Sequence, residues 1–270
     1  MKVLEPIWTE KTETATRLRQ RLETILTWAT VSGYRKGENP ARWKGHLDAV
    51  LPSPAKTKKT KHYPALPYEQ IGTFLQHLRQ SEAISARALE FLILTAKRSN
   101  EILGAKWGEI DFENKLWTIP AERMKKKEKG DHKVPLSRDA INLLKNLPVF
   151  EGSKYLFTAP RGGQFSDMTL SKKIKDLHKA ALKAGAKGYI DPKQDRVVVP
   201  HGFRSTFRDW GAEMTNYPRE VIEQALAHTV GKATEMAYWR GDQLEKRRPL
   251  MEDWGEYCNG IPNDQGATVN

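Results

Sequence analysis

Apolar side chains recur at helical spacing along much of this chain. The first such stretch runs from about Thr14 to Thr30, and its apolar face is formed by Leu18, Leu22, Ile25 and Trp28. Asn39 followed by Pro40 predicts a second, short helix that reaches Leu47, because asparagine caps helices and proline suits the first turn. These elements hold few apolar residues for an independent domain, so we expect a small all-helical fragment that needs a partner or missing upstream elements.

Helical periodicity resumes at Leu66. One predicted helix runs through residues 71–78, and the next contains an apolar run at 89–94 that is hydrophobic nearly all round and should be buried. It stops near Thr95, and Ser99 or Asn100 is expected to cap the helix that follows. Arg98 therefore lies between two buried helices. An arginine so placed is usually paired or functional, because burying it without a partner is costly.

Strand patterns appear next. Residues 109–112 and 116–119 flank a turn signal at 113–115 and predict a hairpin. A lysine-rich segment, 123–131, turns near Gly130 and returns at 133–136 as a basic hairpin, after which Ser137 is positioned to cap a helix. We therefore predict a mainly α protein with a small antiparallel β-sheet, an α+β fold.

Three short predicted helices between residues 200 and 240 carry the candidate chemistry. Phe203, Phe207, Trp210 and Met214 form an apolar stripe. His201, Arg204 and Arg208 fall on a neighbouring face, His228 ends the second helix and Tyr238 lies on the third. A cationic and a titratable side chain one turn apart suit an oxyanion or a phosphate. Taken singly, such residues are ordinarily solvated or structural.

A linker by composition runs from residue 53 to 64, with four lysines among threonines and prolines: Lys56, Lys58, Lys59 and Lys61. The lysines predict a strap that follows a nucleic-acid backbone, and a merely solvated hinge explains them equally well. The expected division is a partial helical domain at 1–52, the linker at 53–64, a large domain at 65–257 and a polar tail at 258–270.

The formal net charge of +12 indicates a polyanionic partner. Binding to a membrane surface would explain the positive charge equally well. However, the sequence has no apolar run that spans a bilayer, no signal-like segment and no lipidation motif. One cysteine, Cys258, fits a reducing compartment. We expect a soluble cytoplasmic protein that binds nucleic acid. The sequence lacks a P-loop and any Cys/His metal spacing.

Five segments together resemble the ordered signature of the tyrosine recombinases. They are Thr95 to Glu101, the lysine hairpin that ends at Val134 to Ser137, His201 to Arg204, Leu226 to His228 and Ala237 to Arg240. The chain is most similar to the prophage and satellite-phage branch of the phage integrases, with which it shares phrases at 39–43 and 119–124. The similarity extends from about residue 6 to 257. It implies a tyrosine-recombinase catalytic domain preceded by a partial core-binding domain, with an N-terminal truncation.

The resemblance implies that DNA is cleaved and rejoined through a covalent 3′-phosphotyrosine, which integrates or excises a prophage or mobile element. Tyr238 would be the nucleophile and His201 its acid/base partner. Arg98 and Arg204 would hold the nonbridging phosphate oxygens, and His228 would donate a further hydrogen bond. A hairpin lysine would protonate the leaving 5′ oxygen. Lys125 is the preferred candidate for this proton donor, and Lys127 and Lys126 are the alternatives.

The resemblance implies double-stranded DNA with an attachment-site core as a partner, and further copies of the chain that form a tetramer on DNA. It also implies accessory DNA-bending or directionality proteins and a bacterial, nucleoid-associated location. No cofactor is expected, and His201 with His228 lacks a third ligand for a metal. The further DNA-binding candidates are Lys126, Lys127, Arg208, Arg240 and the linker lysines.

Two departures from the family pattern concern Ala96 and Asn100, which stand where glycines are common. The alternatives are a DNA-binding remnant without recombination activity and a relaxing enzyme resembling type IB topoisomerases. The first is motivated by the expected truncation, and the second shares the chemistry.

Overall fold

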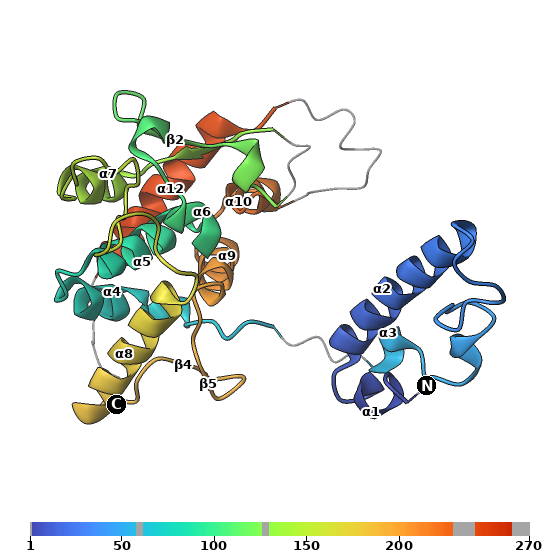
Figure 1. Cartoon of the computed structure of the whole chain (residues 1–270). Coiled ribbons are helices and arrows are strands. Elements are labelled where there is room, and N and C mark those ends of the chain that lie inside the picture. Colours follow the sequence, from blue (N-terminus) through green and yellow to red (C-terminus); the bar gives the residue numbers. More distant parts are fainter. Residues whose placement is uncertain (1, 58–61, 126–129, 229–240, 261–270) are drawn as a thin grey trace. The chain divides into compact units, whose positions relative to one another are not determined.

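The computed structural model describes residues 2–57, 62–125, 130–228 and 241–260 (Figure 1). The chain divides into two compact units, residues 1–62 and 63–270. Each unit is described by itself.

The first unit is helical and small. Its elements are α1 (Glu5–Trp8), α2 (Thr12–Val31), the 3₁₀ turn η1 (Leu47–Ala49) and α3 (Pro54–Thr57). A few buried side chains form its core, namely Leu4, Trp8, Ala15, Leu47 and Leu51. Trp8 stacks on Trp43 with ring centroids 5.4 Å apart, and its indole nitrogen donates to the Pro52 carbonyl at 2.9 Å. Ile25 and Trp28, which belong to the predicted apolar face of α2, are 59% and 60% exposed.

The helix predicted from Asn39 to Leu47 is absent, and the chain forms turns there until η1. The Asn39 side chain caps a turn locally, because its Oδ1 accepts from the amide of Ala41 at 2.9 Å. Its Nδ2 also donates to the Glu23 carbonyl at 2.8 Å. Asparagine thus ties the turn to α2 through contacts that the cap-and-proline signal does not distinguish from a helix start.

The second unit is mainly helical with small antiparallel sheets, as predicted. Its helices are α4 (Ile71–Arg79), α5 (Ile84–Thr95), α6 (Ser99–Leu103), α7 (Arg138–Lys145), α8 (Thr169–Lys183), α9 (Gly202–Met214), α10 (Arg219–Ala225) and α12 (Leu244–Asn259). Its 3₁₀ turns are η2 (Tyr68–Gln70), η3 (Trp107–Glu109) and η4 (Ala121–Arg123). Its strands are β1 (Ile110–Asp111), β2 (Leu116–Ile119), β3 (His132–Pro135), β4 (Ile190–Asp191) and β5 (Arg196–Val197).

The three-stranded sheet has the order β1-β2-β3 and is antiparallel throughout. Ile110 pairs with Trp117, and Trp117 pairs in turn with Val134. This confirms the predicted hairpin at 109–119, and β2 rather than the lysine-rich segment is the outgoing limb of the basic hairpin. Ser137 caps α7 as predicted, with its hydroxyl accepting from the amide of Ala140 at 3.3 Å.

The core of this unit gathers around α5, whose residues from Ala88 to Thr95 are all buried, as its all-round apolar pattern predicts. The aromatic stripe of α9 meets α12 there. Trp254 lies within 5.4 Å of Phe207 and 4.9 Å of Trp210, measured between ring centroids. Its indole nitrogen donates to the Ile93 carbonyl at 2.8 Å. The fourth residue of the expected stripe, Met214, is 56% exposed.

Helix α12 continues to Asn259, past residue 258 where the tail was expected to begin, and Cys258 is fully buried. Within the described residues, no helix combines the length and the apolar composition needed to cross a membrane.

Candidate functional site

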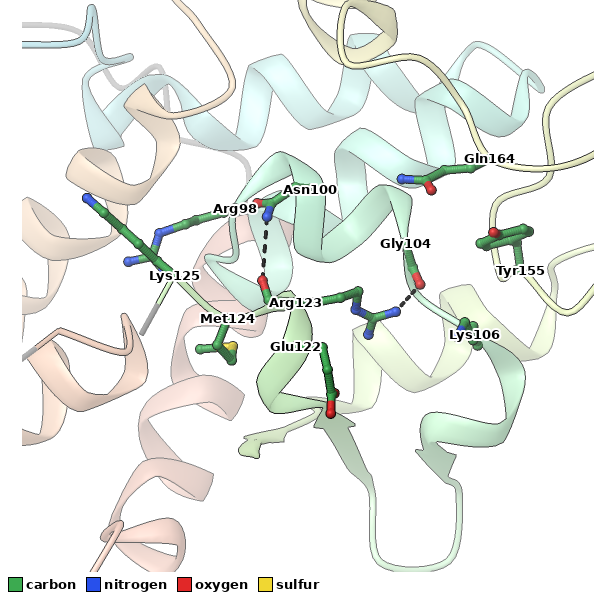
Figure 2. Close-up of a pocket in the computed structure, with 10 residues that line it drawn as sticks. All are labelled: Arg98, Asn100, Gly104, Lys106, Glu122, Arg123, Met124, Lys125, Tyr155 and Gln164. Atoms are coloured by element: carbon green, nitrogen blue, oxygen red, sulfur yellow. Dashed lines mark hydrogen bonds between the residues drawn. The ribbon is translucent and has the colours of Figure 1, made fainter. Parts of the chain in front are cut away.

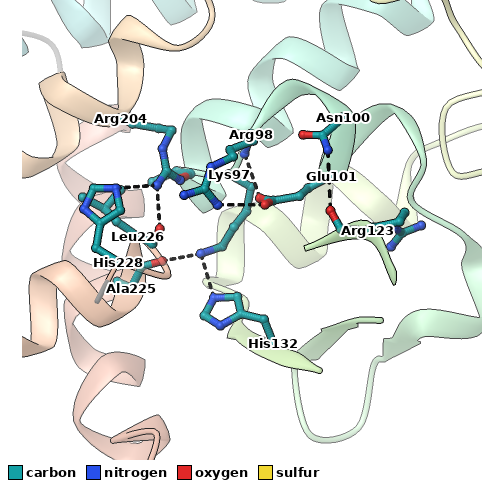
Figure 3. A network of polar contacts seen from close by, with 11 residues as sticks. Lys97, Arg98, Asn100, Glu101, Arg123, His132, Arg204, Ala225, Leu226 and His228 are labelled. Atoms are coloured by element: carbon teal, nitrogen blue, oxygen red, sulfur yellow. Dashed lines mark hydrogen bonds and ion pairs between the residues drawn. The ribbon is translucent and has the colours of Figure 1, made fainter. Parts of the chain in front are cut away.

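Arg204 links three segments of the second unit. The side chain leaves α9 on the face next to the buried stripe, and the residue is only 2% exposed. Its guanidinium donates to the carbonyl oxygens of Ala96 at 2.6 Å and Leu226 at 2.5 Å. These carbonyls belong to the turn after α5 and to the end of α10, so one arginine fixes both segments (Figure 3).

The turn after α5 places Arg98 beside this anchor. Arg98 is the N-cap of α6, ahead of the predicted Ser99 or Asn100. Glu101, which is fully buried, accepts both from the Arg98 amide and from its guanidinium, each at 2.9 Å. A buried carboxylate therefore orients the guanidinium, and the Arg98 side chain keeps 17% of its surface exposed.

Ala96 adopts a backbone conformation in this turn that favours glycine. Its φ of 51° lies in the left-handed region, where it ends α5 as the C-cap. Glycine is the residue that adopts this conformation without steric cost, whereas alanine costs roughly 1 kcal/mol. The turn that carries Arg98 is thus retained at the cost of local strain.

His228 completes the arrangement at the end of α10. Its Nε2 lies 3.0 Å from an Arg204 guanidinium nitrogen, and its Nδ1 lies 2.6 Å from Oε2 of Glu223. Because arginine only donates, Nε2 accepts and Nδ1 carries the proton. Burial lowers the pKa of His228 despite the opposing contact with Glu223, so the ring is neutral near pH 7.

His201 stands at the start of α9 with its side chain exposed. The Tyr63 ring covers part of it, with centroids 4.5 Å apart. Partial burial, followed by the charges of Arg204 and Arg98, lowers the pKa of His201 to about 4. A neutral imidazole near pH 7 is able to accept a proton.

Gly202 permits the close approach that places these residues. A Cβ there would lie 1.9 Å from the Pro64 carbonyl oxygen, so only glycine lets the chain before η2 cross the start of α9. The Thr206 hydroxyl secures the same crossing by donating to the Leu66 carbonyl at 2.6 Å.

Lys97 is a further basic side chain beside the site. It is 1% exposed, and its ammonium donates to the Ala225 carbonyl and lies 3.2 Å from Nε2 of His132. It therefore joins the turn that carries Arg98 to α10 and to strand β3 (Figure 3). Burial, followed by the charge of Arg204, holds the pKa of Lys97 well below its usual value.

A cleft of about 620 Å³ opens beside Arg98 (Figure 2). Lys125 and Arg98 both line it, as do Arg123 and Lys106. The Lys125 side chain is exposed, and its charge also contributes to the low pKa of His201. Lys125 thus stands at the edge of the site, on the loop between β2 and β3.

The electrostatic balance of the site favours an anion. Three basic side chains lie close together, Lys97, Arg98 and Arg204, and the fully buried carboxylate beside them is Glu101. Within the described part of the chain, Nε of Arg204 is a buried donor without a hydrogen-bond partner. Guanidinium groups held in fixed positions suit a phosphate or another oxyanion.

The structure brings together five of the predicted residues: Arg98, Lys125, His201, Arg204 and His228. Arg208, predicted to contact DNA, is half exposed and its Nε donates to Glu223 at 2.8 Å. Lys56 lies in α3 of the first unit. The remaining candidates lie outside the described residues: Tyr238, Arg240, Lys126, Lys127, Lys58, Lys59 and Lys61.

Sequence reasoning did not single out four residues that hold the site, which are Lys97, Glu101, His132 and Glu223. Lys97 and Glu101 stand inside the segment that was singled out for Arg98, and Glu223 stands five residues before His228. For Glu101 alone a signal was available, namely a carboxylate three residues after Arg98, which is helical spacing. Among the described residues, no group of His, Cys, Asp and Glu is arranged to hold a metal ion.

Comparison with known proteins gives consistent matches. A sequence model described as the phage integrase family matches residues 64–245, and one described as the phage integrase central domain matches residues 1–46. The integrase of Enterobacteria phage P4 is 32% identical over 264 residues, which cover 92% of this chain and 56% of that protein. The prophage integrase IntA of Escherichia coli K12 is 30% identical over 266 residues, covering 95% of this chain and 57% of that protein. The chain therefore spans little more than half the length of these relatives.

Solved structures share the fold. An integrase of the Tn1549 transposon, in complex with circular intermediate DNA, has a TM-score of 0.60 at 17% identity, covering 93% of this chain and 83% of that one. A lambda integrase dimer bound to a COC′ core site has a TM-score of 0.57 at 17% identity, covering 84% and 76%. At this level of identity the likeness concerns the fold alone.

Proposed function

This chain belongs to the phage integrase family, and from that premise we propose that it is a tyrosine site-specific recombinase. It would cleave and rejoin DNA to integrate or excise a prophage or mobile element. The observation that carries the proposal is the Arg204 guanidinium, which holds the turn bearing Arg98 and the turn bearing His228 at one place.

The proposed reaction is a transesterification at one DNA phosphodiester. The phenolic oxygen of Tyr238 attacks phosphorus, the bond from phosphorus to the 5′ oxygen breaks, and the tyrosine remains bound to the 3′ phosphate. The attacking phenol loses one proton and the leaving oxygen gains one. The reverse reaction, with a 5′ hydroxyl from another strand, rejoins the DNA and requires no external energy source.

The roles of the site residues follow from their charges and positions. Arg98 and Arg204 would bind the nonbridging oxygens and stabilise the charge of the transition state. His201 is neutral before DNA arrives because its pKa is about 4. A bound phosphate anion would raise that pKa, which favours transfer of the tyrosine proton to the imidazole. Lys125, at the edge of the cleft, would supply the proton to the leaving oxygen.

Duplex DNA is the proposed substrate, in keeping with the net charge of +12. One structural neighbour is a lambda integrase tetramer bound to a Holliday junction, which supports a tetramer of this chain as the recombining assembly. The proposed location is the cytoplasm, where the chain would meet the nucleoid. The linker lysines and Arg240 are proposed to contact the DNA backbone.

A pool of random duplexes, each nicked so that the cleaved end diffuses away, tests the proposal and selects the attachment core in the same experiment. The expected product is a protein–DNA adduct that resists denaturation, is absent from Tyr238→Phe and enriches one core sequence. Retained DNA binding by Tyr238→Phe is the control. Binding of one core sequence without any adduct would instead support a DNA-binding remnant. Relaxation of plasmids without sequence preference would support a topoisomerase.

A further inference from the structure

The Glu223 carboxylate lies between a histidine and an arginine at the edge of the site. It belongs to α10, is 9% exposed, and precedes His228 by five residues. Its Oε2 is 2.6 Å from Nδ1 of His228, and its Oε1 accepts from Nε of Arg208 at 2.8 Å. Both oxygens are engaged, so the carboxylate is fixed in place.

This contact determines which way the His228 ring faces. With its Nδ1 proton committed to Glu223, Nε2 points to Arg204, from which it accepts at 3.0 Å (Figure 3). A phosphate held by Arg204 would meet the same Nε2. To donate to a phosphate oxygen, Nε2 needs a proton of its own. Because Nδ1 keeps its proton, the ring must then be an imidazolium.

The charged groups that face His228 determine when its Nε2 gains this second proton. Arg204 from α9 and Arg98 from the start of α6 oppose a second proton, and His201 is a further titratable ring of the same site. Glu223 favours the proton, and Arg208 anchors its other oxygen. One carboxylate does not outweigh burial and two arginines, since the ring is neutral without a ligand. A bound anion adds the second negative charge.

We propose that Glu223 is a positioning residue, which holds the His228 ring with Nε2 toward the phosphate and lets that ring become a cation when the phosphate is bound. The inference rests on the proposed phosphate-binding role of this site. It makes His228 a donor that is charged with substrate and neutral without it. Without a ligand, the site therefore does not hold an imidazolium beside Arg204 and Arg98.

Nitrogen–proton NMR of isotope-labelled histidine side chains in the full chain tests the proposal. The chain has seven histidines, and His228→Gln assigns the relevant signals. In the parent, His228 should carry its proton on Nδ1, and inorganic phosphate should protonate Nε2 near neutral pH. In Glu223→Gln the carboxylate charge is lost. The ring should then lose its fixed tautomer and stay neutral with phosphate, and phosphate affinity should fall about tenfold, the scale of one charged hydrogen bond.

Glu220→Gln is the matched control, because it removes the same charge one turn earlier on α10. It should leave the tautomer and the phosphate response unchanged. An unaltered His228 tautomer and titration in Glu223→Gln, with a normal thermal transition, would overturn the inference. If the parent His228 shows no response to phosphate, the inference is also overturned. The test uses no DNA, so a missing Tyr238 adduct would refute the proposed function while leaving this result to stand.

Discussion

Replacing Lys97 with methionine removes a buried amine while keeping much of the side-chain volume. The residue is 1% exposed, and the pKa of its amine lies well below the usual value because of burial and the charge of Arg204. A base with a lowered pKa binds fewer protons in the folded state than in the unfolded state. The free energy of unfolding therefore rises with pH between the folded pKa and the unfolded value of about 10.4.

The size of this effect follows from proton linkage. One proton contributes at most about 1.4 kcal/mol per pH unit, or about 2 kcal/mol between about pH 7 and about pH 8.5. The pKa values of His132, His201 and His228 are also lowered, but their contribution is nearly complete by about pH 7.5, since unfolded histidine titrates near about 6.5. The Cys258 thiol, whose pKa is raised, reduces stability only above about pH 8.5.

Urea denaturation at a series of pH values measures the effect. The parent should gain up to about 2 kcal/mol over this range, and Lys97→Met should lose most of that slope. Lys106→Met, which removes a half-exposed lysine from the cleft, is the control and should keep the slope. Parallel curves for the parent and Lys97→Met would refute the reasoning, because they would mean that Lys97 keeps its proton on folding.

Other changes are expected to have the following effects. Ala96→Gly should raise the free energy of unfolding by up to about 1 kcal/mol by relieving the positive φ, and a lower melting temperature would contradict this. Gly202→Ala should destabilise the protein by about 1–3 kcal/mol or more, because its Cβ would meet the Pro64 carbonyl; an unchanged melting temperature would show that the crossing relaxes. Arg98→Ala should slow adduct formation about 10²–10³-fold, and a rate near that of the parent would exclude its phosphate contact. Changing the four linker lysines to glutamine should flatten the salt dependence of DNA binding; these are Lys56, Lys58, Lys59 and Lys61. A slope equal to that of the parent chain would place these lysines away from DNA.

Much of the fold could be predicted because several sequence patterns were compatible with only one type of secondary structure. The run at 89–94 is apolar all round and could only be buried, as α5 is. The turn at 113–115 between two strand patterns predicted the hairpin that β1 and β2 form. The hairpin of β4 and β5 was missed, because strands of two residues have no periodicity. The Asp191 side chain stabilises this hairpin, because it accepts from the amide of Lys193 in the turn at 2.8 Å. It also accepts from the amide of Ala65, in a distant segment, at 3.1 Å.

The site was predictable in its charged residues and not in their supports. Arg98, Arg204 and His228 are recognisable in local motifs, but the bonds from Arg204 to two main-chain carbonyls depend on packing between distant segments. Main-chain acceptors leave no mark in a sequence. Lys97 was likewise missed, because a lysine in a polar motif is ordinarily solvated, and its burial results from β3 and α10 closing over it.

The position of one phosphate tests the central claim most directly. The core duplex recovered from the nicked pool should be crystallised with the Tyr238→Phe chain, which cannot cleave it. We expect one backbone phosphate within about 2.7–3.1 Å of both the Arg98 and Arg204 guanidinium groups and of Nε2 of His228, with residue 238 facing the phosphorus. A duplex bound with its phosphates away from Arg204, or with residue 238 turned from the site, would contradict the account.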